Sequence, residues 1–231
     1  WLLKDSRVRP HVEKDEGMYD GINRGLRRTA GDIVAYLNCD EQYLPGALAA
    51  VERFFSQHPD TEVAFAHTVA VDPAGEYLWH RKALVPLRNH TAVWPLSTLT
   101  CATFFRRSLL TERKLFFDPA WRYCGDCAWV LAMIDAGVKM SVIPQFTSVF
   151  THTGRNLSLE AKAQEEAHRL WASAPLWNRK LRYLVLLQHR VRRLLGGVYS
   201  QRPFEFSLYT EGSPNARVTR YVNKPTFRWR W

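Results

Sequence analysis

Apolar residues recur at helical spacing in five stretches of the chain. Met18, Ile22 and Leu26 follow one another at four-residue steps, which predicts a helix over residues 17–30. The same periodicity predicts four more helices, over 45–57, 125–136, 159–171 and 177–195. Pro45 suits a first helical turn and Gly137 follows a last one, so two of these boundaries also have a chemical marker.

Short apolar runs between the helices predict strands. Residues 33–37, I-V-A-Y-L, are too few for a helix, so we interpret them as a strand buried on both faces, the type found in parallel sheets. Five more strands are predicted over 62–71, 77–85, 100–105, 138–143 and 146–150. The first two of these flank a D-P-A-G turn, Pro144 ends the fourth, and the chain beyond Gly196 is predicted to be irregular. Strands that alternate with helices indicate an α/β fold.

The charge of the chain is placed unevenly. The 231 residues are 46% hydrophobic, enough for one α/β domain with a full core. Residues 175–231 hold 12 of the 32 Lys and Arg but only 2 of the 22 Asp and Glu. This basic tail is predicted to meet a polyanion or an anionic membrane. A membrane-spanning helix is not predicted, because no apolar stretch is long enough and free of charge.

Four cysteines leave two interpretations open. Cys124 and Cys127 have the C-x-x-C spacing of a zinc half-site or a redox pair, and Cys39 with Cys101 would complete four ligands. Cys39 and Cys101 stand far apart in the sequence without a paired partner, however. We therefore favour free thiols in a reducing cytoplasm.

A series of motifs carries most of the functional information. They read E-K-D-E-G-M-Y-D-G-I-N-R-G at 13–25, A-G-D at 30–32, L-N-C-D-E at 37–41 and P-G-A-L at 45–48. In this order they resemble the family-2 glycosyltransferases of bacterial surface-polysaccharide synthesis, whose motifs typically read E-x-D-x-G-x-Y-D-A-x-N-x-G, A-x-G-E, L-N-x-D-D and P-G-A-L. The resemblance continues through A-T-F-F-R-R at 102–107 and G-D at 125–126, and it covers most of the chain.

The resemblance implies a fold and a reaction. The fold is α/β of the GT-A type, a mixed sheet flanked by helices, here followed by a basic helical C-terminal extension. The reaction is an inverting transfer, of the hexosyltransferase type, from a nucleotide-diphosphate sugar to a saccharide or polyprenyl-linked acceptor. Because a diphosphate leaving group needs its developing charge neutralised, we expect a divalent metal, and hard oxygen ligands suit Mg or Mn.

The resemblance also assigns metal and donor ligands. Asp40 matches the metal-binding Asp of the family's D-x-D element, and Asn38 takes the first position, which contacts the donor ribose or the water shell of the metal. Asn38 removes one negative charge and Glu41 replaces a frequent third Asp, so the affinity for metal is open. His152 falls where GT-A enzymes often place a late metal-binding histidine, although a lone His in a turn is more often a solvated loop residue.

The acceptor hydroxyl must lose a proton, which calls for a carboxylate base. Asp126 matches the Asp of the family's E-D element at the amino end of a helix and is the candidate catalytic base, with Gly125 where many relatives carry Glu. A carboxylate there is also an ordinary capping residue, so the resemblance carries this assignment. Asp15, Asp20 and Asn23 resemble the donor-facing edge of the first motif; capping and first-turn charge are the alternative, which explains Asp20 better than Asp15.

The basic tail has three interpretations. Six Lys and Arg surround Leu181, Leu184 and Leu187, the pattern of a helix on an anionic membrane surface, which suits a lipid-linked acceptor. A helix packed on its own domain with a solvated basic face is nearly as well supported. A nucleic-acid-binding arm is disfavoured, because nothing resembles a base-reading motif.

We divide the chain into a GT-A catalytic domain, 1–156, and a helical, basic, aromatic-rich extension, 157–231. Relatives open with a strand and βα units that bind the nucleobase, and none precedes Trp1, so we expect a fragment without its nucleobase-binding portion, whose own activity is open. We expect a cytoplasmic location, at most peripheral on the inner face of the bacterial plasma membrane. The alternative function is a non-catalytic carbohydrate-binding or scaffolding module, prompted by Asn38, Gly125 and the missing opening.

Overall fold

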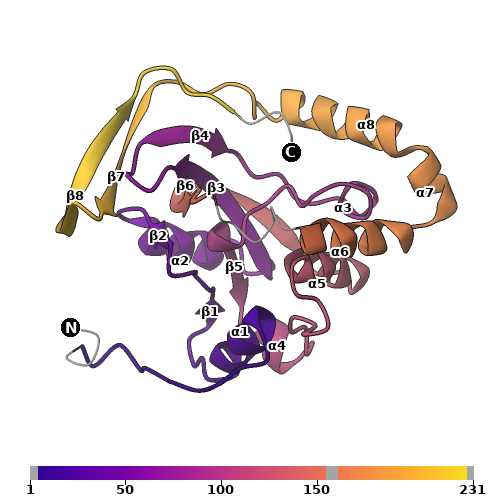
Figure 1. Ribbon diagram of the computed structural model, residues 1–231, viewed down its shortest axis with the longest axis horizontal. Helices are drawn as coiled ribbons and strands as arrows, with labels where there is room; N and C mark the ends of the chain where they lie inside the picture. The colour runs from indigo at the N-terminus through magenta and orange to yellow at the C-terminus, as the bar shows by residue number, and fades with distance from the viewer. Residues whose placement is uncertain (1–4, 155–160, 228–231) are drawn as a thin grey trace.

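A mixed six-stranded sheet lies at the centre of the molecule, with helices around it (Figure 1). The computed structural model describes residues 5–154 and 161–227. The two longest strands of the sheet, β3 (Val63–Val71) and β6 (Met140–Thr151), pair in parallel, and all nine residues of β3 are buried. The other strands are β1 (Ile33–Val34), β2 (Glu41–Tyr43), β4 (Tyr77–Arg81) and β5 (Thr103–Arg106). The strand order is β1-β5-β3-β6-β2, with β4 also paired to β3, which confirms the predicted α/β class.

The β6 strand continues through Pro144, where the sequence predicted a strand end. Its register pairs Ala66 with Ile143 and His67 with Phe146, so Pro144 and the residue after it are passed over. Proline lacks the N–H that a ladder needs, and a bulge is where a sheet tolerates it. The two predicted strands are therefore one, and this strand carries the chain to residue 152.

The stretch 33–37 differs most from its prediction. Only Ile33 and Val34 form a strand, and this strand pairs antiparallel with β5 at one end of the strand order. Val34 is buried but Ile33 is only half-buried, so the prediction of a parallel strand enclosed on both faces is wrong. The apolar run packs beyond the strand instead, where Tyr36 meets Phe117 edge-on with ring centres 5.6 Å apart.

Helices of the predicted kind surround this sheet. The main ones are α1 (Met18–Arg27), α2 (Ala47–Gln57), α5 (Gly125–Asp135), α6 (Ala161–Ala172) and α8 (Arg182–Leu195). Shorter helical turns are α3 (Arg88–Thr91), η1 (Thr100–Ala102), α4 (Ser108–Thr111) and α7 (Leu176–Lys180). One helix was predicted where α7 and α8 now follow each other. Across residues 5–154 and 161–227, none of these helices combines the length and apolar character needed to cross a bilayer.

A cluster of aromatic rings joins α1 and α5 to the sheet. Phe117 stacks on Trp129 with ring centres 4.4 Å apart, and Tyr19 stacks on Phe117 at 5.3 Å. All three side chains are buried in a core that also contains Val34 and Phe105. Burial of such rings is a large part of the stabilisation of a domain this size. Here it also places the amino ends of α1 and α5 side by side, which positions the candidate site.

A β-hairpin follows α8, where the sequence predicted irregular structure. Its strands are β7 (Phe204–Thr210) and β8 (Ser213–Val222), paired antiparallel. Phe206 and Leu208 are buried against Val69 and Val149 of the central sheet, and Figure 1 shows the hairpin at the opposite end of the molecule from α7. The alternation F-E-F-S-L-Y-T over 204–210 is the signal that indicates such a strand, and the basic aromatic composition of the tail obscured it.

Candidate active site

The first turn of α5 presents the carboxylate of Asp126. Its Oδ1 atom accepts a 2.8 Å hydrogen bond from the backbone N–H of Cys127, and the residue is only partly exposed. Burial raises the pKa of Asp126 to about 6; the bond from Cys127 opposes this rise, and the negative charge of Glu166 adds to it. A carboxylate with this pKa is mostly ionised at pH 7 and is still basic enough to accept a proton.

Tyr19 of α1 holds the start of α5 in place. Its hydroxyl accepts a 3.1 Å bond from the backbone N–H of Asp126 and donates to the carbonyl of Tyr123 over 3.4 Å. Burial raises the pKa of Tyr19, with the charge of Asp126 as the next cause, so the phenol keeps its proton. The ring also covers Gly125, where an added Cβ atom would lie 2.5 Å from it. The packing of Tyr19 therefore explains the glycine that departs from the family motif.

Glu166 of α6 binds the loop that leads into α5. Its Oε1 atom accepts the backbone N–H of Arg122 at 2.8 Å, and its Oε2 atom accepts those of Tyr123 and Cys124, both at 2.7 Å. The side chain is 8% exposed. Carboxylate bonds to backbone N–H groups are among the stronger hydrogen bonds in proteins. One buried side chain thus fixes the three residues that come just before Gly125 and Asp126.

Tyr36 connects the end of β1 with the candidate base. Burial raises the pKa of Tyr36, and the negative charge of Asp126 is the second cause, which places the two side chains close together. A hydrogen bond with the Thr100 side chain acts in the opposite direction. The chain therefore passes beside Asp126 immediately before it reaches the turn at 38–41.

The turn at 38–41 directs its two acidic side chains differently. The backbone N–H of Asn38 donates to Oε2 of Glu41 at 2.9 Å, and the N–H of Glu41 donates to the carbonyl of Asn38 at 3.1 Å. Glu41 is 6% exposed, and burial raises its pKa. Asp40 is exposed, and within the described part of the chain its carboxylate makes no hydrogen bond or ion pair. Glu41 therefore stabilises the turn, and Asp40 is available to a ligand.

The pairing of β2 with β6 brings His152 to the same turn. Glu41 pairs with Phe150, and the Oγ1 of Thr151 donates a 2.5 Å bond to the carbonyl of Asp40. His152 comes next; its backbone N–H is bonded to a carbonyl of β3, and its imidazole has no hydrogen bond among the residues that the structure describes. The structure thus places Asp40 and His152, the two predicted metal ligands, at the same end of one strand pair.

These two side chains suit a metal that arrives with its substrate. Across residues 5–154 and 161–227, no three His, Cys, Asp or Glu side chains gather into a metal site. Mg and similar ions commonly take one or two carboxylates from the protein and complete their shell with water and substrate phosphates. An exposed Asp40 and a nearby His152 fit this kind of shared site.

The four cysteines do not gather within the described residues. Cys39 is exposed and Cys101 is buried, while the sulfur atoms of Cys124 and Cys127 lie 3.7 and 3.5 Å from two different backbone carbonyls. Burial raises the pKa of Cys124 to about 12, so its thiol keeps the proton. Cysteines that do not gather cannot supply the four ligands of one zinc site, so among the described residues this arrangement favours thiols over the zinc alternative.

Asp15 and Asp20 organise the loop that precedes α1. Oδ1 of Asp15 accepts the backbone N–H of Gly17 at 3.1 Å, and Asp20 accepts that of Glu16 at 3.0 Å. Asp20 also pairs with Arg24 at 2.8 Å, and these two interactions hold the pKa of Asp20 below its usual range. Hydrogen bonds to the loop backbone and the pair with Arg24 therefore account for the contacts of these two residues, and donor binding by Asp15 and Asp20 stays a prediction.

Asn23 lies in the interior. The side chain is 2% exposed; its Nδ2 donates to the carbonyl of Phe117 at 2.7 Å, and its Oδ1 accepts the N–H of Phe117 at 3.0 Å. Both ends of the amide are used within the fold, one turn along α1 from Tyr19. The structure therefore places Asn23 where it supports the Tyr19 and Phe117 stack, rather than with Asp15 and Asp20 on the surface.

Sequence analysis missed Glu166 and Tyr36. A signal for Glu166 exists, because it shares the buried stripe of α6 with Ala163 and Leu170. A carboxylate on such a stripe indicates a buried partner. Its partners are backbone N–H groups more than 40 residues away, and these leave no mark in the sequence.

Comparisons with known proteins show which family and fold the chain is similar to. A family model described as Glycosyl transferase family 2 matches residues 3–135, more than half of the chain. The crystal structure of S. aureus TarS 1-349 in complex with UDP-GlcNAc is similar with a TM-score of 0.50 and 18% identity, over 71% of this chain and 48% of that one. The structure of S. aureus TarS 1-349 in complex with UDP gives a TM-score of 0.40 and 15% identity, over 67% and 45%. The chain spans less than half the length of these structures, and no curated protein matches it.

Proposed function

The chain belongs to glycosyl transferase family 2 and has a GT-A-type fold. From this premise we propose that the protein transfers a sugar of the hexose class from a nucleotide-diphosphate donor to a saccharide or lipid-linked acceptor, with inversion, in cell-surface polysaccharide synthesis. One observation carries the proposal: a partly buried Asp126 with a pKa of about 6 at the start of α5, close to the end of β1. The UDP-GlcNAc bound to TarS supports a nucleotide-sugar donor.

In the proposed reaction the acceptor hydroxyl attacks the anomeric carbon of the donor. A bond forms between the acceptor oxygen and this carbon while the bond from the carbon to the diphosphate oxygen breaks. The nucleoside diphosphate leaves with that electron pair, and Asp126 takes the hydroxyl proton. Tyr19 and Glu166 hold the backbone around Asp126, so the carboxylate does not have to be ordered when the acceptor binds.

The donor side of the site is proposed on the turn at 38–41. Asp40 and His152 would hold Mg or Mn, which would supply the charge neutralisation that the leaving diphosphate needs. Asn38 contacts the ribose or the water shell of the metal, and Asp15 and Asp20 face the donor from the loop before α1. Asn23 supports the Tyr19 and Phe117 stack from within the core.

We keep the division at 156 and 157 as a proposal about function. Residues 1–156 carry the catalytic and donor-binding side chains, and 157–231 form the extension. The extension also serves the catalytic part, because Glu166 binds the loop before α5 and the hairpin packs on the central sheet.

A non-catalytic carbohydrate-binding or scaffolding module is the second candidate. The observation that favours it is the inward direction of Glu41, since this leaves Asp40 as the one exposed carboxylate of a turn that begins with Asn38. Fewer exposed carboxylates give a weaker metal site. Such a module would bind a sugar without consuming the donor.

Incubation with a panel of nucleotide sugars and manganese separates the two candidates. We expect donor turnover that Asp40→Ala abolishes, whereas Asp60→Ala, at another exposed Asp, leaves it unchanged. We expect Asp126→Asn to lower sugar transfer by about 10²–10⁴-fold with unchanged donor affinity. Asp135→Asn, at the other end of α5, is the matched control. If no donor in the panel is turned over, the binding module is favoured. Near wild-type transfer by Asp126→Asn would show that Asp126 is not the base.

A lipid-linked acceptor also sets the location that we propose. The protein would work in the cytoplasm, peripheral to the inner face of the bacterial plasma membrane. The excess of Lys and Arg over Asp and Glu in residues 175–231 supports contact with an anionic surface.

A further inference from the structure

The α8 helix exposes its apolar face to solvent, unlike an ordinary surface helix. It buries Val185, His189 and Arg193, which recur every four residues along its inner side. Five large apolar residues point to the opposite side, each 47–81% exposed: Leu184, Leu187, Val191, Leu194 and Leu195. A helix on a folded domain normally buries its apolar stripe and exposes its charges.

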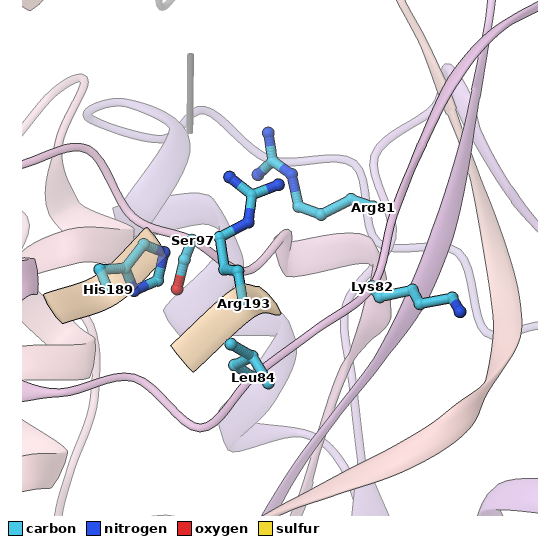
Figure 2. A pocket seen from close by; sticks show the side chains of 6 residues that line it. All are labelled: Arg81, Lys82, Leu84, Ser97, His189 and Arg193. Carbon is cyan, nitrogen blue, oxygen red and sulfur yellow. The ribbon is translucent and has the colours of Figure 1, made fainter. Parts of the chain in front are cut away.

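The inner side of α8 buries two polar side chains and one apolar one. Figure 2 shows His189 and Arg193 directed inward from the helix, with the guanidinium of Arg193 beside that of Arg81. The space that these side chains line with Ser97 is about 10 Å³, room for roughly one water molecule. Neither ring nitrogen of His189 has a hydrogen-bond partner among the described residues, although the side chain is 4% exposed. Val185 alone of the three inner residues is apolar, and it packs with Ala92 and Val93. Burial of apolar surface therefore explains only part of the orientation of the helix.

Specific contacts fix the orientation of α8. His189 stacks on His90 of α3 with ring centres 3.7 Å apart, and the Nε1 of Trp94 donates a 3.0 Å bond to the carbonyl of Arg182. These contacts lie at the start and in the middle of the helix. The fold thus holds the apolar stripe outward.

The charges beside this stripe indicate what covers it. Residues 176–200 contain six Lys and Arg and no Asp or Glu. Arg193 is directed inward and Arg192 is half-buried, and the other four are exposed: Arg179, Lys180, Arg182 and Arg190. The preceding helix α7 adds Leu176 and Trp177, which are 65% and 52% exposed. A flat helix with an apolar stripe and basic margins fits an anionic lipid surface, because the acyl boundary takes the leucines and the headgroups take the cations.

We propose that this outer face of α8, the five exposed apolar residues from Leu184 to Leu195, docks on an anionic lipid bilayer with the helix parallel to the membrane plane. The proposal deepens the proposed function and rests on it for its biological sense, since a lipid-linked acceptor lies in the same surface. It also restricts the membrane contact predicted for the basic tail to one helix face, because the β7 and β8 hairpin lies at the other end of the molecule (Figure 1).

Co-sedimentation of the full chain with vesicles tests the proposal. Vesicles of phosphatidylcholine mixed with phosphatidylglycerol should bind the wild type, and pure phosphatidylcholine vesicles should bind it far less. High salt should weaken binding, because the Debye length falls from about 10 Å at 0.1 M to about 3 Å at 1 M. Leu187→Glu combined with Val191→Glu should lower binding to the mixed vesicles about tenfold or more.

The matched control is Leu48→Glu combined with Leu78→Glu, since these residues are 61% and 41% exposed on α2 and β4 and the same two charges are introduced there. Its vesicle binding should equal that of the wild type, and circular dichroism should show all variants folded. Equal binding by the double variant, or no binding by the wild type, would overturn the proposal. A wild-type dimer that the double variant dissociates, without vesicle binding, would assign the face to a second copy instead. Vesicle binding needs no donor, so binding without sugar transfer would contradict the proposed function alone.

Discussion

The start of α5 and the body of α8 both bury polar side chains, and they treat them in opposite ways. At α5 the carboxylate of Glu166 accepts three backbone N–H bonds, and Asp126 accepts one. At α8 the imidazole of His189 is buried with neither nitrogen bonded among the described residues, while leucines face solvent. An unsatisfied buried polar group costs about 1–3 kcal/mol. The buried acidic groups at the start of α5 find their hydrogen-bond partners within this chain, whereas the imidazole of His189 finds none among the described residues.

The difference indicates that the start of α5 is ordered by the chain itself, whereas the outer face of α8 is suited to contact with a partner. The α5 end is preorganised: its acidic groups are ordered by contacts that exist before any substrate binds. In our proposal, an anionic lipid surface covers the outer face of α8. The following predictions test each half of this comparison, beginning with the largest effect.

Removal of Glu166 should have the largest effect on stability. Glu166→Ala leaves three backbone N–H groups without their acceptor, so we expect the free energy of unfolding in urea to fall by about 3 kcal/mol. Glu165→Ala removes the same charge from the neighbouring exposed position and should change it by less than about 0.5 kcal/mol. Similar losses from both variants would mean that the contacts of Glu166 contribute nothing special.

Gly125→Ala tests the contact between Tyr19 and α5. The new Cβ would lie 2.5 Å from the Tyr19 ring, so we expect a loss of about 2 kcal/mol in the free energy of unfolding, as overpacking produces. Gly25→Ala is the control, because nothing lies within 4 Å of a Cβ there. That variant should gain about 0.5–1 kcal/mol, as Ala favours a helix over Gly. A neutral Gly125→Ala would show that Tyr19 moves freely.

Asp126→Asn should stabilise the protein at high pH. The folded pKa of about 6 lies above the usual value of 3.8, so the associated stability is fully present below pH 3.8 and is lost as the pH rises through 6. Asn undergoes no such loss. Thermal unfolding should therefore show the variant more stable by about 2 kcal/mol at pH 8 and nearly equal to the wild type at pH 4. A less stable variant at pH 8 would show that Asp126 is not held in an unfavourable setting.

His189→Leu should produce a smaller gain on the other side of the comparison. Burial lowers the pKa of His189 from 6.5 to about 3, so the stability linked to its neutral form is present above pH 6.5 and is lost as the pH falls. Leu removes the unsatisfied ring, and we expect a gain of about 1 kcal/mol in urea unfolding at pH 7 that grows at lower pH. His168→Leu, at an exposed His of α6, should show no such growth. A loss at pH 7 would mean that the stack with His90 outweighs the unpaired nitrogens.

Local patterns predicted much of the fold. Periodicity predicted α2 and α5, and the turn before Glu76 predicted the β3 and β4 hairpin, because these elements depend on neighbours in sequence. The bulge at Pro144 and the true place of β1 depend on strands far along the chain. No local pattern specifies those partners.

The candidate site also has a part that the sequence predicted and a part that only the structure shows. The motif resemblance singled out Asp126, Asp40 and His152, and the structure adds that the last two lie at one end of the β2 and β6 pair. The motif resemblance did not reveal that the packing of Tyr19 requires glycine at position 125, or that Glu166 orders the loop before Asp126. Those contacts join residues more than 40 positions apart, through backbone groups that every residue carries.

The central claim is that Asp126 removes the proton of the acceptor, and the pH dependence of kcat/KM for sugar transfer tests it most directly. For the wild type, kcat/KM should fall as the pH drops through about 6, where Asp126 takes a proton in the free protein. Asp126→Asn should transfer about 10²–10⁴-fold more slowly and should lack this acid limb. A variant that keeps both the wild-type rate and the wild-type acid limb would contradict the account.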